Sequence, residues 1–155
     1  MKKFILIFFL FNLSVLNATS NTILFLGDSL TDGFGVSKED AFPKLFENLI
    51  QTELNKNIVV INGGVSGSTT SDGLARLKWY MKKKPYLVFL ALGTNDGLRG
   101  LDLEQSQKNL EEIISHAQAS NAKVILAGML IPPNYGPEYS EQFKRMYEKL
   151  QIKYK

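Results

Sequence analysis

Three residues, Ser29, Gly67 and Asn95, each follow an apolar stretch of the sequence and could together perform acyl transfer. A serine hydroxyl attacks a carbonyl once a base removes its proton, and the attack creates an oxyanion that needs hydrogen-bond donors. The backbone N–H groups of Ser29 and Gly67 and the side-chain amide of Asn95 are candidates for three such donors. Turn chemistry explains each residue when it is taken alone. Their joint placement is what favours a catalytic site.

Short apolar runs alternate with amphipathic stretches along the chain, and these elements must position the three residues. This alternation predicts a parallel sheet with helices on both faces, in which the carboxyl ends of the strands share one edge. Ser29, Gly67 and Asn95 each follow a different strand, so we expect them to converge there. The predicted order is strand 22–26, helix 42–54, buried strand 58–61, a helix through Met81 that Pro85 ends, strand 86–92, helix 103–119, strand 123–127 and a last helix that Pro137 opens.

The first 20 residues are typical of a secretory signal peptide. Lys2 and Lys3 give a basic start, residues 4–16 are almost wholly apolar, and Ala18-Thr19-Ser20 supplies small residues for cleavage. A retained anchor is the alternative, but the apolar stretch is shorter than the roughly 20 residues that a membrane span needs. We therefore expect one domain over residues 21–155, a periplasmic or secreted location, and no stable membrane span after cleavage.

Composition excludes several classes of function. The formal net charge is +3, and two of the lysines behind it belong to the signal peptide, so no nucleic-acid partner is expected. The chain has no cysteine and one histidine, which argues against a metal site. It has neither a Gly-x-Gly-x-x-Gly fingerprint nor a Walker loop, so no cofactor is expected and a flavodoxin-like nucleotide binder is the weakest hypothesis. Composition does not indicate an oligomeric state.

Several sequence blocks carry a resemblance to a known family. Gly27-Asp28-Ser29-Leu30, Val65-Ser66-Gly67 and Gly93-Thr94-Asn95-Asp96 resemble the first three blocks of the SGNH hydrolases, also called GDSL-type esterases and lipases. The resemblance runs from about Thr22 to the end of the chain. It is closer to the secreted bacterial branch of thioesterase I, lysophospholipase and arylesterase, whose local patterns resemble Gly73–Leu77, Asn95–Gly100 and Pro133–Gly136.

This resemblance implies a three-layer α/β/α fold with a flavodoxin-like parallel sheet. It implies hydrolysis of carboxylic esters or thioesters, such as acyl esters, aryl esters or lysophospholipids, through an acyl-serine intermediate. Ser29 would be the nucleophile and first oxyanion donor, Gly67 the second donor and Asn95 the third. Asp28 would be structural, and the loop 128–136 would border an acyl-binding groove. The partner would then be a small-molecule ester or thioester.

The general base is where this sequence departs from the family pattern. The family uses a histidine in a C-terminal Asp-x-x-His block, and here no aspartate follows Asp102. The single histidine, His116, lies inside the predicted helix 103–119, away from the strand-end loops. The last strand and helix of the family fold are also expected to be missing, either because the sequence is a fragment or because the product is short. The alternative function is a catalytically inactive remnant or binding module that lost its base.

Overall fold

Four parallel strands form one sheet in the computed structural model, which describes residues 21–154. The predicted signal peptide, residues 1–20, lies outside the described residues. The strands have the spatial order β2-β1-β3-β4. Gly27 at the end of β1 pairs with Gly64 of β2 and Ala91 of β3, so these three strands end level with one another. Their bounds are β1 Thr22–Gly27, β2 Val59–Gly64, β3 Leu87–Ala91 and β4 Lys123–Leu126.

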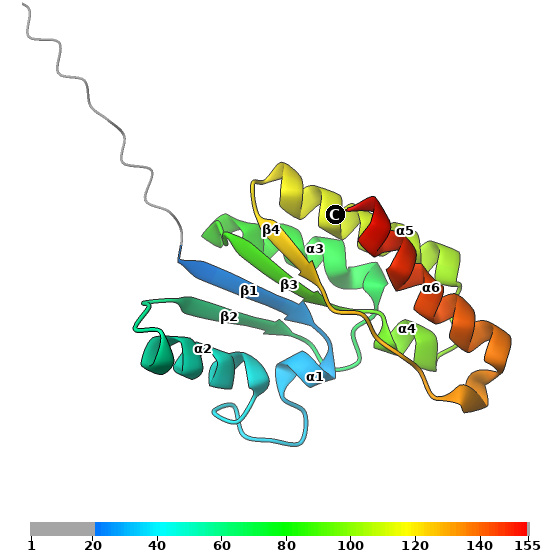
Figure 1. Cartoon of the computed structure of the whole chain (residues 1–155), viewed down its shortest axis with the longest axis horizontal. Helices are drawn as coiled ribbons and strands as arrows, with labels where there is room; N and C mark the ends of the chain where they lie inside the picture. The colour runs from blue at the N-terminus through cyan, green and yellow to red at the C-terminus, as the bar shows by residue number, and fades with distance from the viewer. Residues whose placement is uncertain (1–20, 155) are drawn as a thin grey trace, which may run out of the picture.

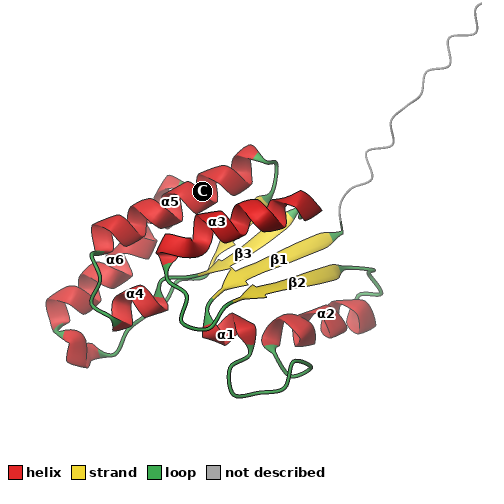
Figure 2. Cartoon of the chain, turned by 180° about the vertical axis from the view of Figure 1, so that it is seen from behind, coloured by secondary structure: helices red, strands yellow, loops and turns green. Residues whose placement is uncertain are grey.

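Helices lie on both sides of the sheet. The helices α3, α5 and α6 pack on one face, and α1 and α2 lie on the other side, next to β1 and β2 (Figures 1 and 2). The parallel α/β architecture predicted from the alternating pattern is thereby confirmed. The helices are α1 Ser29–Asp32, α2 Phe42–Glu53, α3 Thr70–Tyr80, α4 Thr94–Leu98, α5 Leu103–Ala119 and α6 Pro137–Lys153, with short 3-10 turns at Met81–Lys83 and Pro133–Tyr135.

The central strand β1 explains how both layers are held. Successive side chains of a strand point to opposite faces. Leu24 and Leu26 are fully buried in the core beneath α3, α5 and α6. Phe25 faces the other way and packs edge-on against the rings of Phe42 and Phe46 on α2, with centroids 5.4 and 5.3 Å away. Apolar side chains on both faces keep the end of β1 fixed between two layers.

The strand β2 differs from its prediction. The sequence predicts a buried strand over 58–61, whereas the observed strand begins at Val59, runs to Gly64 and forms an edge of the sheet. Val59 is 45% exposed because an edge strand has a neighbour on one side only. The apolar stripe of α2 is also partly open to solvent, since Leu45 and Leu49 stay half exposed. The outer part of this layer is therefore less buried than its apolar sequence indicates.

The opposite edge strand, β4, is also half covered. Val124 and Leu126 pack towards α5 and α6, while Ile125 on the other face is 48% exposed. Figure 1 looks onto this open face of the sheet, where no described helix crosses in front of β3 and β4. Within residues 21–154, none of the helices combines the length and the apolar composition required to cross a membrane.

Candidate active site

Ser29 lies where β1 passes into α1. The Asp28 side chain caps this short helix by accepting a hydrogen bond from Leu30 N at 3.0 Å, and Ser29 is its first residue. A Cβ at Gly27 would clash with the side chain of Thr31, so a glycine is needed for α1 to fold back on the strand end. Ser29 is half-buried and lies at the carboxyl edge of the sheet.

The loop that carries Gly67 is tied to the Ser29 helix. Val65 N donates to Gly27 O at 3.2 Å, and Ser66 Oγ donates to the Asp32 carboxylate of α1 at 2.7 Å. Gly67 has φ +79°, in the left-handed region where a side chain is strained. The residue is exposed, so a ligand held at Ser29 can approach its backbone.

Asn95 lies in a helix, where the sequence predicts a loop. After β3, Gly93 turns the chain with φ +118° and the short helix α4 starts at Thr94. Asn95 Nδ2 donates one hydrogen bond to Ser68 O at 2.8 Å. A side-chain amide nitrogen has two N–H groups, so one remains for a ligand. The helix orients this amide towards the Gly67 loop.

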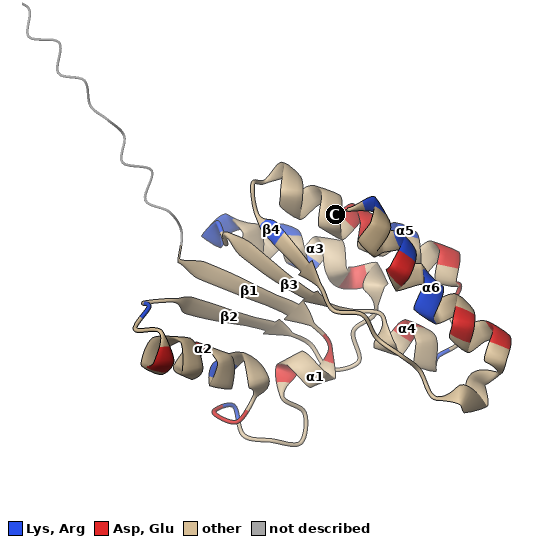
Figure 3. Cartoon of the chain, in the orientation of Figure 1, with Lys and Arg blue, Asp and Glu red and all other residues tan. Residues whose placement is uncertain are grey.

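Two arginines that the sequence analysis did not single out complete the arrangement. Arg76 of α3 donates to Gly63 O at 2.7 Å and to Gly27 O at 3.1 Å, which joins the ends of β1 and β2. Arg99 donates to Gly67 O at 2.9 Å from the outer side. Both lie inside blocks that resemble the family, Gly73–Leu77 and Asn95–Gly100, but those blocks did not indicate which groups the arginines contact. Figure 3 shows acidic residues at the end of β1 and on α1.

His116 is not part of this cluster. It occupies the last turn of α5, which leads directly into the start of β4. The site lies at the opposite edge, where the strands end. A base must come within hydrogen-bond reach of the serine, and His116 is placed too far along the sheet to do so. Within residues 21–154 there is also no group of histidine, cysteine and acidic side chains that could hold a metal ion.

A tyrosine supports the turn beneath Asn95. Tyr147 of α6 is buried and donates its hydroxyl to Leu92 O at 2.9 Å. Burial raises the pKa of Tyr147 well above its ordinary value, and the nearby negative charges of Asp96 and Asp28 add to the effect. A Cβ at Gly93 would clash with the Tyr147 hydroxyl. The tyrosine therefore acts as a neutral support for the end of β3.

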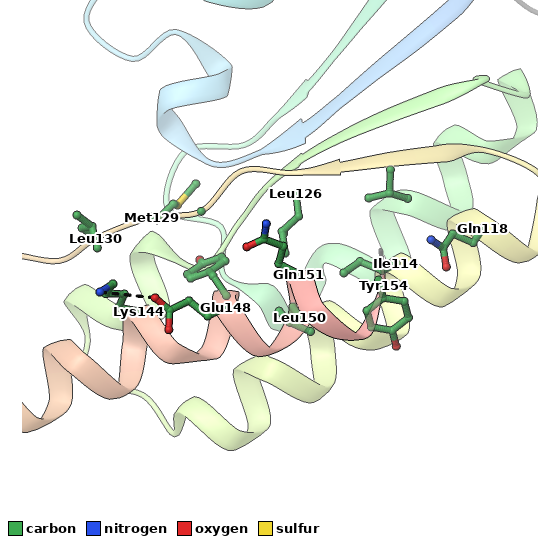
Figure 4. A pocket seen from close by; sticks show the side chains of 13 residues that line it. Ile114, Gln118, Leu126, Met129, Leu130, Lys144, Glu148, Leu150, Gln151 and Tyr154 are labelled. Atoms are coloured by element: carbon green, nitrogen blue, oxygen red, sulfur yellow. Dashed lines mark ion pairs between the residues drawn. The ribbon is translucent and has the colours of Figure 1, made fainter.

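A cavity among the described residues lies beside the site and not at it. It has a volume of about 400 Å³ and lies between β4, the loop after it, and the helices α5 and α6 (Figure 4). None of Ser29, Gly67 and Asn95 lines it. Met129 links its lining to the site, because the Met129 sulfur accepts a hydrogen bond from Thr94 Oγ1. The lining residues are Ile114, Gln118, Val124, Leu126, Gly128, Met129, Leu130, Lys144, Tyr147, Glu148, Leu150, Gln151 and Tyr154.

The described residues thus place a serine hydroxyl, a glycine N–H and an asparagine amide on three connected strand-end segments. A model of the GDSL-like Lipase/Acylhydrolase family matches residues 25–154. The chain belongs to this family. Membership in the GDSL family makes it a hydrolase of the esterase class, as the sequence blocks predict.

Individual GDSL relatives agree with this assignment. The chain is 40% identical over 141 residues to an arylesterase of Vibrio mimicus. The aligned region covers 90% of this chain and 70% of the relative. It is 38% identical over 143 residues to the thioesterase 1/protease 1/lysophospholipase L1 of Escherichia coli K12. That aligned region covers 92% of this chain and 67% of the relative. The solved structure of AlinE4, an SGNH-hydrolase family esterase, superposes with a TM-score of 0.82 at 38% identity over 88% of this chain and 73% of that one. The chain thus spans about two thirds to three quarters of these relatives.

Proposed function

We propose that this chain acts on a small-molecule carboxylic ester or thioester through an acyl-serine intermediate on Ser29. The observation that supports this most directly is the hydrogen-bonded connection of the Ser29, Gly67 and Asn95 segments at one edge of the sheet. The names of the relatives, arylesterase and thioesterase, support an activated or thiol leaving group. No cofactor takes part in the proposed reaction.

The proposed chemistry begins with attack of Ser29 Oγ on the acyl carbonyl carbon. A bond forms between Oγ and that carbon, the serine proton leaves, and the carbonyl oxygen becomes an oxyanion. The N–H groups of Ser29 and Gly67 and the amide of Asn95 donate to this oxygen, an arrangement that stabilises the transition state. Collapse expels the alcohol or thiol with a proton, and water then releases the acid by the same steps.

The acceptor of the serine proton limits the rate of this proposed reaction. The single histidine of the sequence is at the opposite edge of the sheet. No histidine lies at the site within residues 21–154, and oxyanion stabilisation and binding alone supply a roughly thousand- to ten-thousandfold acceleration. Covalent trapping tests the proposal better than turnover does.

Intact-mass spectrometry after treatment with an activated ester, p-nitrophenyl acetate, tests the acyl-serine. We expect one acetyl group on Ser29, located by peptide mapping, and none in the Ser29→Ala variant. Ser120→Ala is the matched control, because Ser120 is exposed at the far end of α5 and should leave acylation unchanged. A folded chain that shows no acetyl on Ser29 would contradict the proposal.

The position of His116 also favours a second candidate, a binding module that holds acyl esters without turning them over. Ester hydrolysis by the chain should then be the same in the unaltered protein and in Ser29→Ala. Saturable binding of an ester, measured by calorimetry, would distinguish this candidate from an inert remnant.

We also propose export to the periplasm or beyond the cell. The support is the basic start and apolar stretch of residues 1–20. N-terminal sequencing of the protein recovered from its source cells should place the mature start near Asn21. A start at Met1 in the recovered protein would contradict export with cleavage.

A further inference from the structure

Asp96 is a buried carboxylate to which the proposed chemistry assigns no role. It is 2% exposed and lies in α4, next to Asn95. Its Oδ2 accepts a hydrogen bond from Thr70 N at 2.9 Å, and its Oδ1 accepts from Thr70 Oγ1 at 2.6 Å and from Ser106 Oγ at 3.0 Å. Thr70 and Ser106 are also buried, at 1% and 2% exposure. Hydrogen bonds to a buried charge are stronger than neutral ones, so this contact is firmly held.

The network joins three helices that approach the site from different directions. Thr70 is the first residue of α3, so the positive end of that helix faces the Asp96 carboxylate. Ser106 belongs to α5, and Asn109 of the same helix donates from Nδ2 to Thr70 Oγ1 at 2.9 Å. One carboxylate therefore fixes the start of α3 against α4 and α5.

Two consecutive side chains hold the segment that follows Gly67. Asn95 donates to Ser68 O, and Asp96 accepts from Thr70 N, so α4 forms hydrogen bonds to both ends of the segment 68–70. Arg76 holds the same segment from the opposite side, through Ser68 Oγ at 2.5 Å. These contacts within the protein fix the Asn95 amide and the Gly67 loop relative to one another, and they do not depend on a bound substrate.

We propose that Asp96 is a positioning residue that holds the Gly67 N–H and the Asn95 amide in the geometry of an oxyanion hole. The proposal rests on the proposed function of these two groups as donors. A carboxylate accepts all three hydrogen bonds at once. An amide in its place keeps one acceptor oxygen and turns an N–H₂ group towards a donor, so at least one contact to Thr70 or Ser106 is lost.

The test compares Asp96→Asn with Asp102→Asn in the full chain. Asp102 is the matched control, because it undergoes the same chemical change, caps α5 through Glu104 N and Gln105 N, and makes none of the contacts to the Gly67 loop. Asparagine is also a good N-cap, so the control should fold. The first readout is amide hydrogen exchange of Ser68, whose N–H donates to Val65 O at 3.1 Å.

In Asp96→Asn we expect Ser68 exchange to become about tenfold faster or more, the factor that corresponds to loss of one charged hydrogen bond. The side-chain amide resonances of Asn95 should shift as well. In Asp102→Asn both should match the unaltered chain. A general loss of stability would change exchange throughout the core, whereas the proposed role changes it locally at the segment 68–70.

The second readout is the reaction of Ser29 with a fluorophosphonate probe, whose phosphoryl oxygen occupies the same hole. Asp96→Asn should lower the maximal labelling rate about tenfold with an unchanged half-saturating concentration, and Asp102→Asn should change neither. If the unaltered chain does not react at Ser29, the proposed function fails, while Ser68 exchange and the Asn95 resonances still decide the role of Asp96.

The positioning role is overturned if folded Asp96→Asn keeps the Ser68 exchange rate and the Asn95 resonances of the unaltered chain. Should this variant not fold, Thr70→Val and Thr70→Ser probe the same contact from the other side. The Thr70→Val variant lacks the hydroxyl that donates to Asp96 Oδ1, whereas the Thr70→Ser variant retains it. Equal Ser68 exchange in these two variants would also overturn the role.

Discussion

In the proposed site, Asn95 is the residue whose side-chain amide would turn an ordinary polar turn into an oxyanion hole. Its amide is held by Ser68 O and keeps a free N–H at the edge of the sheet where Ser29 lies. Loss of one such donor lowers the rate about a hundred- to a thousandfold. Asn95→Ala should therefore slow acetylation of Ser29 by p-nitrophenyl acetate by that factor. Asn48→Ala, on the exposed side of α2, should leave the acetylation rate unchanged, and equal rates in both variants would remove Asn95 from the site.

Substitution of Gly67 tests whether its backbone N–H acts as an oxyanion donor. Its φ of +79° is one that other residues adopt at a cost of roughly 1–2 kcal/mol, and a Cβ there would meet Arg99 Nη2 at an unstrained 3.5 Å. Gly67→Ala should therefore fold but rotate its N–H, and acetylation of Ser29 should fall at least about tenfold. Gly35→Ala provides the comparison, because Gly35 also has positive φ, at +87°, but lies in the loop before α2. Equal acetylation rates in both variants would contradict a role for the Gly67 N–H.

The raised pKa of Tyr147 makes stability depend on alkaline pH. The folded tyrosine keeps its proton above pH 10, its ordinary pKa, while the unfolded one loses it. The contribution of Tyr147 to the free energy of unfolding is therefore fully present below pH 10. Above pH 10 the free energy of unfolding falls by about 1.4 kcal/mol per pH unit. Tyr147→Phe should remove this part of the alkaline decline, and loss of the bond to Leu92 O should cost about 1 kcal/mol at neutral pH.

Urea unfolding of both proteins at neutral and alkaline pH measures the difference. The exposed Tyr135→Phe serves as the control and should keep the slope of the unaltered chain. If Tyr147→Phe keeps it too, the buried hydroxyl does not retain its proton.

At the scale of elements, Glu47 joins α2 to the edge strand β2. One carboxylate oxygen accepts from Val60 N at 2.9 Å and the other pairs with Lys44 at 2.9 Å. Desolvation raises the pKa of Glu47, but the hydrogen bonds from Lys44 and Val60 outweigh it and lower the pKa overall. Its contribution to stability is therefore present above its ordinary pKa of 4.5 and lost as pH falls through the lowered value.

Glu47→Gln should flatten the acid side of the stability profile, as measured by urea unfolding between neutral and acid pH. Glu53→Gln is the matched control, since Glu53 is exposed at the end of the same helix. An acid limb of unchanged steepness in Glu47→Gln would show that the contact to β2 is not maintained in solution.

Periodicity located the elements well because burial and sequence agree in the interior. The helix predicted over 103–119 is observed at Leu103–Ala119, since its apolar side chains face the core and Asp102 caps it. The strand predicted at 58–61 is present as β2, but its predicted burial was wrong because an apolar run does not reveal its position in the sheet, and β2 lies at an edge. The helix that holds Asn95 was missed because its five residues are too few for a periodic pattern.

The sequence placed Ser29, Gly67 and Asn95 at one edge of the sheet because residues that follow parallel strands must converge. It did not indicate Arg76 or Asp96 as partners of these residues. Both act through backbone groups of segments far away in the sequence, such as Gly27 O and Thr70 N. Such contacts depend on how helices pack, and no spacing in a single sequence encodes them.

At the scale of the whole molecule, the sheet is covered unequally. Its α5 and α6 side contains the hydrophobic core, whereas Ile125 and the apolar stripe of α2 are partly exposed on the other side. Unfolding therefore exposes less new apolar surface than it would if helices covered both faces of the sheet equally. Because that surface sets the heat capacity change of unfolding, calorimetry of residues 21–155 should yield less than the roughly 12–15 cal/mol/K per residue of typical globular proteins. If the heat capacity change of unfolding instead reaches the typical value and increases with protein concentration, self-association covers the open face. The thermal midpoint would then also rise with protein concentration.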